Sequence, residues 1–267
     1  MNSIGIFDSG VGGLSVLREV AALLPRESVR YVADSAHCPY GHRPADEVLA
    51  LSLDIVRFLL DKKSKLIVVA CNTATAAAID ELRRRFPHVP FVGMEPAVKP
   101  AVEQSRTRSV GILATAGTLQ GRPFSRTRER YAAGVKLHVA AGNGLVELVE
   151  QGREDSAEAE ALLRAYLQPM LDDSVDELVL GCTHYPFLSG CIEKVTQGRM
   201  VIVNPAPAVA AQVERLLVQR GLLADEVDAA QASYEFFSTG DVKTLAQLQK
   251  KHLPQLGERC SFRELSL

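Results

Sequence analysis

The chain of 267 residues has no apolar run that approaches the ~20 residues a membrane-spanning helix needs. It also shows no signal peptide and no lipidation motif, so we expect a soluble protein without membrane contact. No cluster of lysine and arginine rivals the footprint of a nucleic-acid-binding protein, and the 30 lysines and arginines are nearly balanced by 32 aspartates and glutamates. This balance argues against nucleic acid as a partner and favours a small molecule.

Several cofactor and metal patterns are also missing. The glycines of residues 10–13 follow a predicted strand, but Val16 stands where G-x-G-x-x-G needs its third glycine, so dinucleotide binding is not expected. No lysine lies in a recognisable pyridoxal-phosphate context, and no C-x-x-C spacing indicates zinc. We therefore expect no cofactor and no metal, although Cys71, Cys182 and His184 could together supply three metal ligands.

The five cysteines are odd in number and widely scattered. They are Cys38, Cys71, Cys182, Cys191 and Cys260. Without a secretory signal, such a pattern argues against a disulfide framework and predicts a reducing, cytoplasmic location.

Apolar runs alternate with helical patterns along the whole chain, which is typical of an α/β protein with largely parallel sheets. Strands are expected at residues 3–7, 29–33, 66–70, 90–93, 109–115, 135–140, 178–180, 200–203 and 234–238, with a last apolar stretch near Phe262. Helices are expected at residues 14–24, 45–61, 74–86, 118–131, 144–151, 154–171, 205–220 and 241–253. Residues 38–44 are rich in turn formers and predict an irregular loop.

The sequence contains an internal repeat. Residues 109–115 reproduce the apolar pattern and glycine placement of residues 3–9, at an offset of 106 (109 minus 3). Cys71 and Cys182 are 111 residues apart, so one duplication with small insertions explains both matches. We therefore expect two pseudo-symmetric α/β lobes, with residues 1–97 and 205–267 in the first and residues 98–204 in the second.

Cys71 and Cys182 each follow a buried apolar run and precede a helical segment. Open α/β sheets bind ligands at the carboxyl ends of their strands, and helix amides there favour a thiolate. Asn72 or Thr73 is the expected N-cap of the helix after Cys71. Thiols in two matched places predict a pair that faces across a cleft between the lobes, although each could instead be a small buried hydrophobe.

The two halves differ in the ionisable residue expected beside each thiol. The repeat aligns Asp8 with Ala114, so Asp8 would lie near Cys71 alone, and His184 would lie near Cys182. An aspartate can orient a thiol although its charge raises the thiol pKa, and a histidine can accept the thiol proton. The simpler alternatives are that Asp8 only caps a helix and that His184 is a core histidine.

Five motifs carry a resemblance to a known family. They are DSGVGGL at residues 8–14, PYG at 39–41, ACNTA at 70–74, LGCTHYP at 180–186 and FSTGD at 237–241. Together they resemble the glutamate racemases, within the aspartate/glutamate racemase superfamily. The resemblance implies cofactor-independent conversion of L-glutamate to D-glutamate, a precursor of bacterial peptidoglycan.

The resemblance also implies roles for individual residues. Cys71 and Cys182 would be the paired acid and base, Cys71 for D-glutamate and Cys182 for L-glutamate, with help from Asp8 and His184. The amino acid would contact Asp8, Ser9, Tyr40, Gly41, Asn72, Thr73, Thr183 and His184, with Glu150 and Thr115 behind them. A homodimer is expected, as is the absence of the N-terminal extension that some relatives use for activation by a cell-wall precursor.

Three other functions share this scaffold. An aspartate racemase or a decarboxylase of the superfamily would keep the fold and alter the pocket, and a non-catalytic amino-acid-binding protein would not need both thiols. The presence of both Cys71 and Cys182 argues against a single-cysteine decarboxylase.

Overall fold

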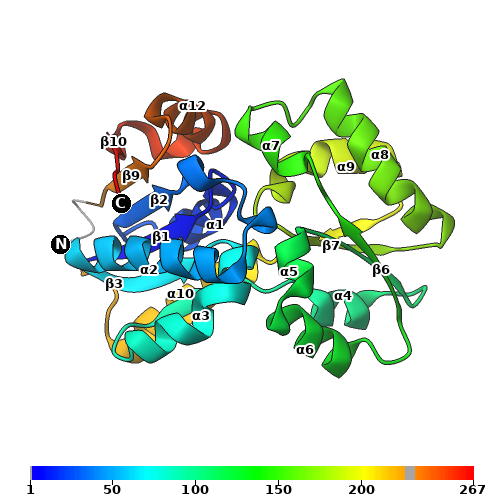
Figure 1. Ribbon diagram of the computed structural model, residues 1–267, viewed down its shortest axis with the longest axis horizontal. Helices are drawn as coiled ribbons and strands as arrows, with labels where there is room; N and C mark the ends of the chain where they lie inside the picture. The colour runs from blue at the N-terminus through cyan, green and yellow to red at the C-terminus, as the bar shows by residue number, and fades with distance from the viewer. Residues whose placement is uncertain (1, 226–231) are drawn as a thin grey trace.

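The computed structural model describes residues 2–225 and 232–267, and its strands form two parallel sheets (Figure 1). The strands are β1 (Ser3–Asp8), β2 (Val29–Ala33), β3 (Ser64–Val69), β4 (Phe91–Gly93), β5 (Ser109–Ala114), β6 (Lys136–Ala141), β7 (Glu177–Gly181), β8 (Val201–Val203), β9 (Tyr234–Ser238) and β10 (Cys260–Glu264). One sheet has the order β10-β9-β2-β1-β3-β4 and the other has the order β6-β5-β7-β8. Every neighbouring pair of strands is parallel.

Helices connect the strands. The α-helices are α1 (Leu14–Leu23), α2 (Ala45–Asp61), α3 (Asn72–Arg85), α4 (Val98–Gln104), α5 (Ala116–Gln120), α6 (Arg122–Tyr131), α7 (Leu145–Glu150), α8 (Ala157–Asp172), α9 (Ser189–Thr196), α10 (Ala206–Arg220) and α12 (Val242–His252). Short 3₁₀ helices are η1 (Ser35–His37), η2 (Tyr40–His42), η3 (Tyr185–Leu188) and η4 (Pro254–Arg259). None of the described helices is long and apolar enough to cross a bilayer.

Helices cover both faces of each sheet, which explains why the strands are continuous apolar runs rather than alternating ones. In β1, Ile4 and Ile6 share a core with α1 and α10, whereas Phe7 packs with α2 and α3. In the second sheet, Leu178 shares a core with α8 and α9, whereas Val179 packs with α4 and α6. Figure 1 shows the two sheets side by side, each between its own helices.

The order β2-β1-β3-β4 in the first sheet matches the order β6-β5-β7-β8 in the second. The predicted fold class, two similar α/β lobes with parallel sheets, is confirmed. The tail adds β9 beside β2 and β10 beside β9, so it extends the first sheet. The boundaries near residues 97 and 205 stay a prediction.

Two of the predicted elements differ from the structure. The helix expected at residues 118–131 is two helices, because Gly121 between α5 and α6 is extended (φ −72°, ψ 147°) and Pro123 lies in the first turn of α6. The loop expected at residues 38–44 contains the single turn of η2, and η1 precedes it. Both turns follow β2 and lie above the carboxyl end of the first sheet.

Candidate active site

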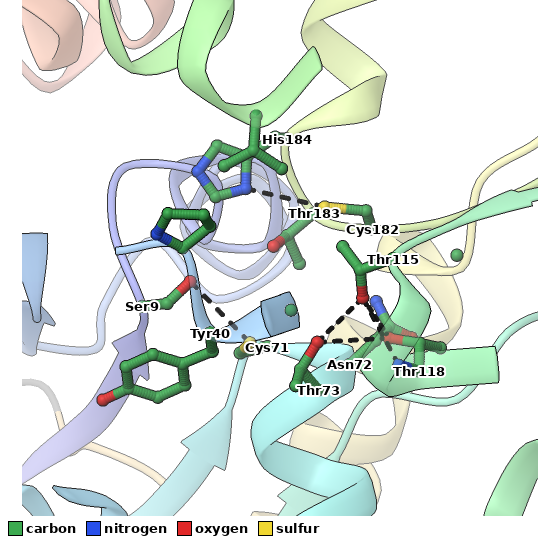
Figure 2. A pocket seen from close by; sticks show the side chains of 14 residues that line it. Ser9, Tyr40, Cys71, Asn72, Thr73, Thr115, Thr118, Cys182, Thr183 and His184 are labelled. Atoms are coloured by element: carbon green, nitrogen blue, oxygen red, sulfur yellow. Dashed lines mark hydrogen bonds between the residues drawn. The ribbon is translucent and has the colours of Figure 1, made fainter. Parts of the chain in front are cut away.

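A pocket with about 260 Å³ of empty volume lies between the two sheets at the carboxyl ends of their strands. Its walls come from both lobes (Figure 2). The lining residues are Ser9, Pro39, Tyr40, Gly41, Cys71, Asn72 and Thr73 from the first lobe, and Thr115, Thr118, Val146, Gly181, Cys182, Thr183 and His184 from the second. Only about 10 Å³ of this space has room for the centre of a water-sized sphere, so the pocket is nearly closed.

Cys71 is the N-cap of α3. Its backbone is extended (φ −125°, ψ 123°), and its Sγ accepts a hydrogen bond from the amide of Ala74 at 3.4 Å. The prediction that Asn72 or Thr73 caps this helix is wrong, because the chain is already helical at Asn72. A sulfur atom here fills the place that the oxygen of Ser, Thr, Asp or Asn commonly takes.

Burial raises the pKa of the Cys71 thiol well above its usual range, and the nearby charge of Asp8 raises it further. The Ala74 amide acts in the opposite direction and lowers this pKa, but its effect is smaller. The expectation that helix amides favour a thiolate at Cys71 is therefore wrong on balance, because the loss of solvent outweighs one long hydrogen bond. Cys71 holds its proton and donates it toward the Oγ of Ser9 at 3.9 Å.

Asp8 is fully buried behind the pocket wall, at the end of β1. Its Oδ2 accepts hydrogen bonds from the amides of Gly13 at 2.9 Å and Gly10 at 3.4 Å, and its Oδ1 accepts one from the hydroxyl of Thr183 at 3.3 Å. Burial raises the pKa of Asp8, while the charge of His184 and the Gly13 amide lower it. Asp8 thus holds the turn into α1 and contacts a residue of the other lobe.

Cys182 has a different partner. Its Sγ lies 3.6 Å from Nδ1 of His184, and Nε2 of His184 lies 2.6 Å from Oε1 of Glu150. Burial lowers the pKa of His184, but the hydrogen bonds to Cys182 and its other neighbours outweigh burial and raise this pKa well above the usual range. Glu150 also accepts the amide of Val11 at 2.7 Å. A protonated His184 between a thiolate and a carboxylate would satisfy both anions.

Three threonine hydroxyls meet where the lobes touch. The Oγ1 atom of Thr73 lies 2.8 Å from that of Thr115, which lies 2.9 Å from that of Thr118 (Figure 2). Hydroxyls both donate and accept, so such a cluster can turn its protons toward a bound carboxylate. The sequence reasoning missed Thr118, although the repeat aligns it with Gly12 of the first glycine-rich turn (118 minus 106).

Asn72 lines the pocket with both polar atoms of its side chain buried and without a hydrogen-bond partner among the described residues. A buried amide left unpaired is costly, so such a group marks a place where a ligand completes the hydrogen bonds.

The hydroxyl of Tyr40 is fixed by a hydrogen bond on the side away from the pocket. This hydroxyl donates to Oδ2 of Asp34 at 2.5 Å, and Oδ1 of the same carboxylate accepts from the hydroxyl of Thr239 at 2.6 Å. The ring and backbone of Tyr40, rather than its hydroxyl, therefore face the pocket (Figure 2). Two features of the sequence could have predicted this contact. Thr239 belongs to the motif at residues 237–241, and Asp34 directly follows a predicted strand.

The predicted site residues lie in two positions relative to the pocket. Those that line it are Ser9, Tyr40, Gly41, Cys71, Asn72, Thr73, Thr115, Cys182, Thr183 and His184. Asp8 and Glu150 lie behind this wall and hold it by hydrogen bonds. The sequence reasoning also missed Pro39, Val146 and Gly181, which shape the pocket with backbone and apolar surface.

Comparison with known proteins gives one consistent result. A family model described as Asp/Glu/Hydantoin racemase matches residues 4–213. The glutamate racemase of Roseiflexus sp. (strain RS-1) is 47% identical over 245 residues, which are 92% of this chain and 90% of that protein.

Two solved structures are similar over nearly their whole length. A glutamate racemase isoform from Bacillus anthracis has a TM-score of 0.87 and 32% identity, covering 100% of this chain and 98% of that one. Escherichia coli glutamate racemase, in complex with L-glutamate and the activator UDP-MurNAc-ala, has a TM-score of 0.83 and 30% identity, covering 94% and 96%.

Proposed function

This chain belongs to the Asp/Glu/Hydantoin racemase family, and from that premise we propose that it interconverts L- and D-glutamate without a cofactor. The observation that carries the proposal is that Cys71 and Cys182 line one pocket from opposite lobes, each within two residues of the carboxyl end of the equivalent strand. Racemisation removes the Cα proton from one face and returns a proton to the other. Two bases on opposite walls of a pocket suit that geometry.

The proton balance follows from the two thiols. With L-glutamate, a Cys182 thiolate takes the Cα proton, and the Cys71 thiol gives its proton to the opposite face. The product is D-glutamate, with Cys182 as the thiol and Cys71 as the thiolate. With D-glutamate the same steps run in reverse.

His184 and Asp8 would assist one thiol each. The raised pKa of His184 keeps an imidazolium 3.6 Å from Cys182, where it stabilises the thiolate that begins the reaction of L-glutamate. Glu150 orients this ring through the 2.6 Å contact to Nε2. Burial and then Asp8 raise the pKa of Cys71, which keeps this thiol protonated during the reaction of L-glutamate and makes its thiolate the stronger base in the reaction of D-glutamate.

Substrate carboxylates would be bound by hydroxyls and amides rather than by arginine or lysine. Thr73, Thr115 and Thr118 offer a hydroxyl cluster, and the unpartnered side chain of Asn72 offers both a donor and an acceptor. Ser9 and Thr183 line the same pocket. Fixed dipoles of this kind would stabilise the negative charge that develops on the α-carboxylate as the proton leaves.

The test is to incubate the purified chain with L-glutamate, with no cofactor added, and to follow optical rotation. The rotation should decay to zero from either enantiomer, and the double variant Cys71→Ser/Cys182→Ser should leave it constant. L-aspartate in parallel separates the aspartate racemase alternative. A wild-type chain that binds L-glutamate without changing its rotation would support the binding-protein alternative instead.

The product of this reaction, D-glutamate, is a precursor of peptidoglycan. The homodimer and the cytoplasmic location expected from the sequence belong to this proposal too. All five cysteines are free, which fits a reducing compartment, and two of them must stay thiols for the chemistry. Light scattering of the purified chain measures the oligomeric state.

A further inference from the structure

Three metal-binding groups meet behind the pocket, at the junction of the lobes. One ligand atom from each of Cys38, Glu150 and His184 lies within 4.8 Å of the other two. The Sγ of Cys38 donates to Oε1 of Glu150 at 3.6 Å, and Nε2 of His184 lies 2.6 Å from that oxygen. Among the described residues this is the only such group, and it differs from the trio Cys71, Cys182 and His184 considered from the sequence.

We propose that Cys38, Glu150 and His184 form an inhibitory site for Zn²⁺ and similar divalent ions. Thiolate, imidazole and carboxylate are the ligands that Zn²⁺ takes in proteins, and three protein ligands leave the fourth tetrahedral position to water. The groups come from three places, the turn between η1 and η2, the last residue of α7, and the residue before η3. Proteins whose metal ligands converge from separate elements bind the ion only in the folded state.

The inhibition rests on the proposed function, because the ion would change the proton state of His184 beside Cys182. A metal on Nε2 needs the lone pair that the proton of the imidazolium occupies, the proton that now points to Glu150, so binding of the ion releases this proton. His184 then can no longer be the doubly protonated partner of a Cys182 thiolate. The carboxylate of Glu150 has further lone pairs, so it can keep the amide of Val11 while it binds the ion.

The ion would also hold the lobes together. Cys38 follows β2 of the first sheet, whereas Glu150 and His184 belong to elements packed on the second sheet. A bond from one metal to all three residues therefore crosses the junction that must open for glutamate to reach a pocket this small. The changed proton state of His184 and the bond across the lobes would each slow racemisation, so bound Zn²⁺ is expected to lower turnover.

The experiment compares the wild type with Cys38→Ser, in which a hydroxyl replaces the thiolate ligand. Co²⁺ is the spectroscopic probe, because a thiolate bound to Co²⁺ gives a charge-transfer absorption band. We expect one Co²⁺ per wild-type chain with this band, and racemisation inhibited by Zn²⁺. Cys38→Ser should keep its racemase activity and lose the band. The Zn²⁺ concentration that halves its activity should be higher than in the wild type by at least about 10–100-fold, which is the loss of metal affinity when a residue that only contacts a metal ligand is removed.

Cys260→Ser is the matched control, since Cys260 is a free, half-buried cysteine like Cys38 but lies in β10. It should keep both the band and the sensitivity to Zn²⁺. Glu150→Gln tests the cluster without touching a thiol, and it should weaken Co²⁺ binding while the charge-transfer band persists at saturation.

Two results would overturn the proposal. Equal inhibition of the wild type and Cys38→Ser by Zn²⁺ would place the ion on Cys71 or Cys182 instead, and so would an unchanged Co²⁺ band in Cys38→Ser. The spectroscopy is independent of turnover. A Cys38-dependent band in a chain that fails to racemise glutamate would therefore support the metal site and remove only the proposed function.

Discussion

The two thiols occupy equivalent places in the two sheets but have unlike neighbours. Cys71 caps a full α-helix, and its sulfur accepts one helix amide. Cys182 is followed by the short η3, and its sulfur faces the imidazole of His184 instead. The duplicated fold thus positions two similar groups, while the residues around them give one thiol an acidic neighbour and the other a basic neighbour. A reaction that needs one thiol and one thiolate requires that difference.

The turns that follow β1 and β5 show the same contrast. A Cβ at Gly12 would lie 2.3 Å from Nδ1 of His184, so the first turn must be free of side chains for the histidine to fit. In the second lobe the aligned residue is Thr118, whose hydroxyl joins Thr73 and Thr115 instead. One copy of the turn makes room for a group from the other lobe, and the second copy supplies a side chain to the pocket.

The strongest way to break the comparison is to remove each thiol in turn. Cys71→Ser and Cys182→Ser should each lower kcat for racemisation by about 10²–10⁴-fold. A serine hydroxyl is a much weaker acid than a thiol, and near neutral pH almost none of it is ionised to act as a base. Cys191→Ser, which changes a buried cysteine of α9, should leave kcat unchanged. Equal activity of Cys71→Ser and the wild type would remove Cys71 from the mechanism.

Labelling in heavy water tests the same point in the unmodified enzyme. With a base on each wall, early product from either enantiomer should carry deuterium at Cα, while the remaining substrate stays protiated. Proton NMR of the Cα signal follows both pools. Rapid and equal labelling of both pools would indicate that one base serves both faces.

The next prediction concerns the difference between kcat from L-glutamate and kcat from D-glutamate. His184→Asn should lower kcat more from L-glutamate, which begins at Cys182, and Asp8→Asn should lower it more from D-glutamate. Both losses should be smaller than the about 10²–10⁴-fold contributed by a base itself, because these residues act through the thiols. The equilibrium constant between enantiomers is unity, so KM must change to keep kcat/KM equal in the two directions.

Full progress curves from both enantiomers measure these parameters. His138→Asn, on the half-buried strand β6, is a suitable control and should not change the ratio of the two kcat values. If both variants lost kcat equally in both directions, the assignment of one helper to each thiol would be wrong.

A smaller effect concerns pH. Because burial and then Asp8 raise the pKa of Cys71, this thiol keeps its proton above its ordinary pKa of about 8.5, and the alkaline fall of kcat/KM should lie above that pH. Asp8→Asn removes a negative charge that raises this pKa, so the fall should move to lower pH. The kcat/KM profile of each protein, with either enantiomer, measures the shift. A fall that Asp8→Asn leaves in place would exclude Cys71 as the group that titrates.

The sequence predicted the parallel sheets and the places of the thiols because both depend on local patterns. The run of β3 is apolar without alternation, which only a strand covered on both faces requires, and Cys71 stands where that run ends. The strand β10 was predicted only as an apolar stretch near Phe262, for the opposite reason. It lies at the edge of its sheet and its residues are exposed or half-buried, so its apolar pattern is weak; pairing with β9 and the stacking of Phe262 on Phe236 hold it in place.

Contacts between distant residues left little trace in the sequence. Glu150 accepts the amide of Val11, 139 residues away, and Tyr40 depends on Asp34 and Thr239, residues on two different strand ends. The pKa of Cys71 also depends on total burial, which no local pattern measures. Position after a strand was therefore predictable, while the proton state and the supporting contacts followed only from three-dimensional packing.

The smallest predicted effect concerns a contact between α12, which packs against the first lobe, and the loop after α7 in the second. The carboxylate of Glu154 is buried, and it pairs with Lys251 at 2.6 Å and with His252 at 3.2 Å. Lys251→Met should lower the free energy of unfolding by no more than about 1 kcal/mol, because the lysine side chain is 44% exposed and solvent screens the pair. Lys250→Met, on the exposed side of the same helix, should change it by less than about 0.5 kcal/mol.

This loss should depend on pH, and the direction follows from His252. Burial lowers the pKa of His252, Glu154 raises it, and Lys251 lowers it, so removing Lys251 raises it. A histidine whose pKa is lowered on folding costs the protein stability as pH falls, and this cost is smaller in a variant whose folded histidine has a higher pKa. Urea unfolding should therefore show that Lys251→Met is less destabilising at pH 6 than at pH 8, where neutral His252 leaves Glu154 without a cation. An equal loss at both pH values would mean that His252 does not replace Lys251 as the partner of Glu154.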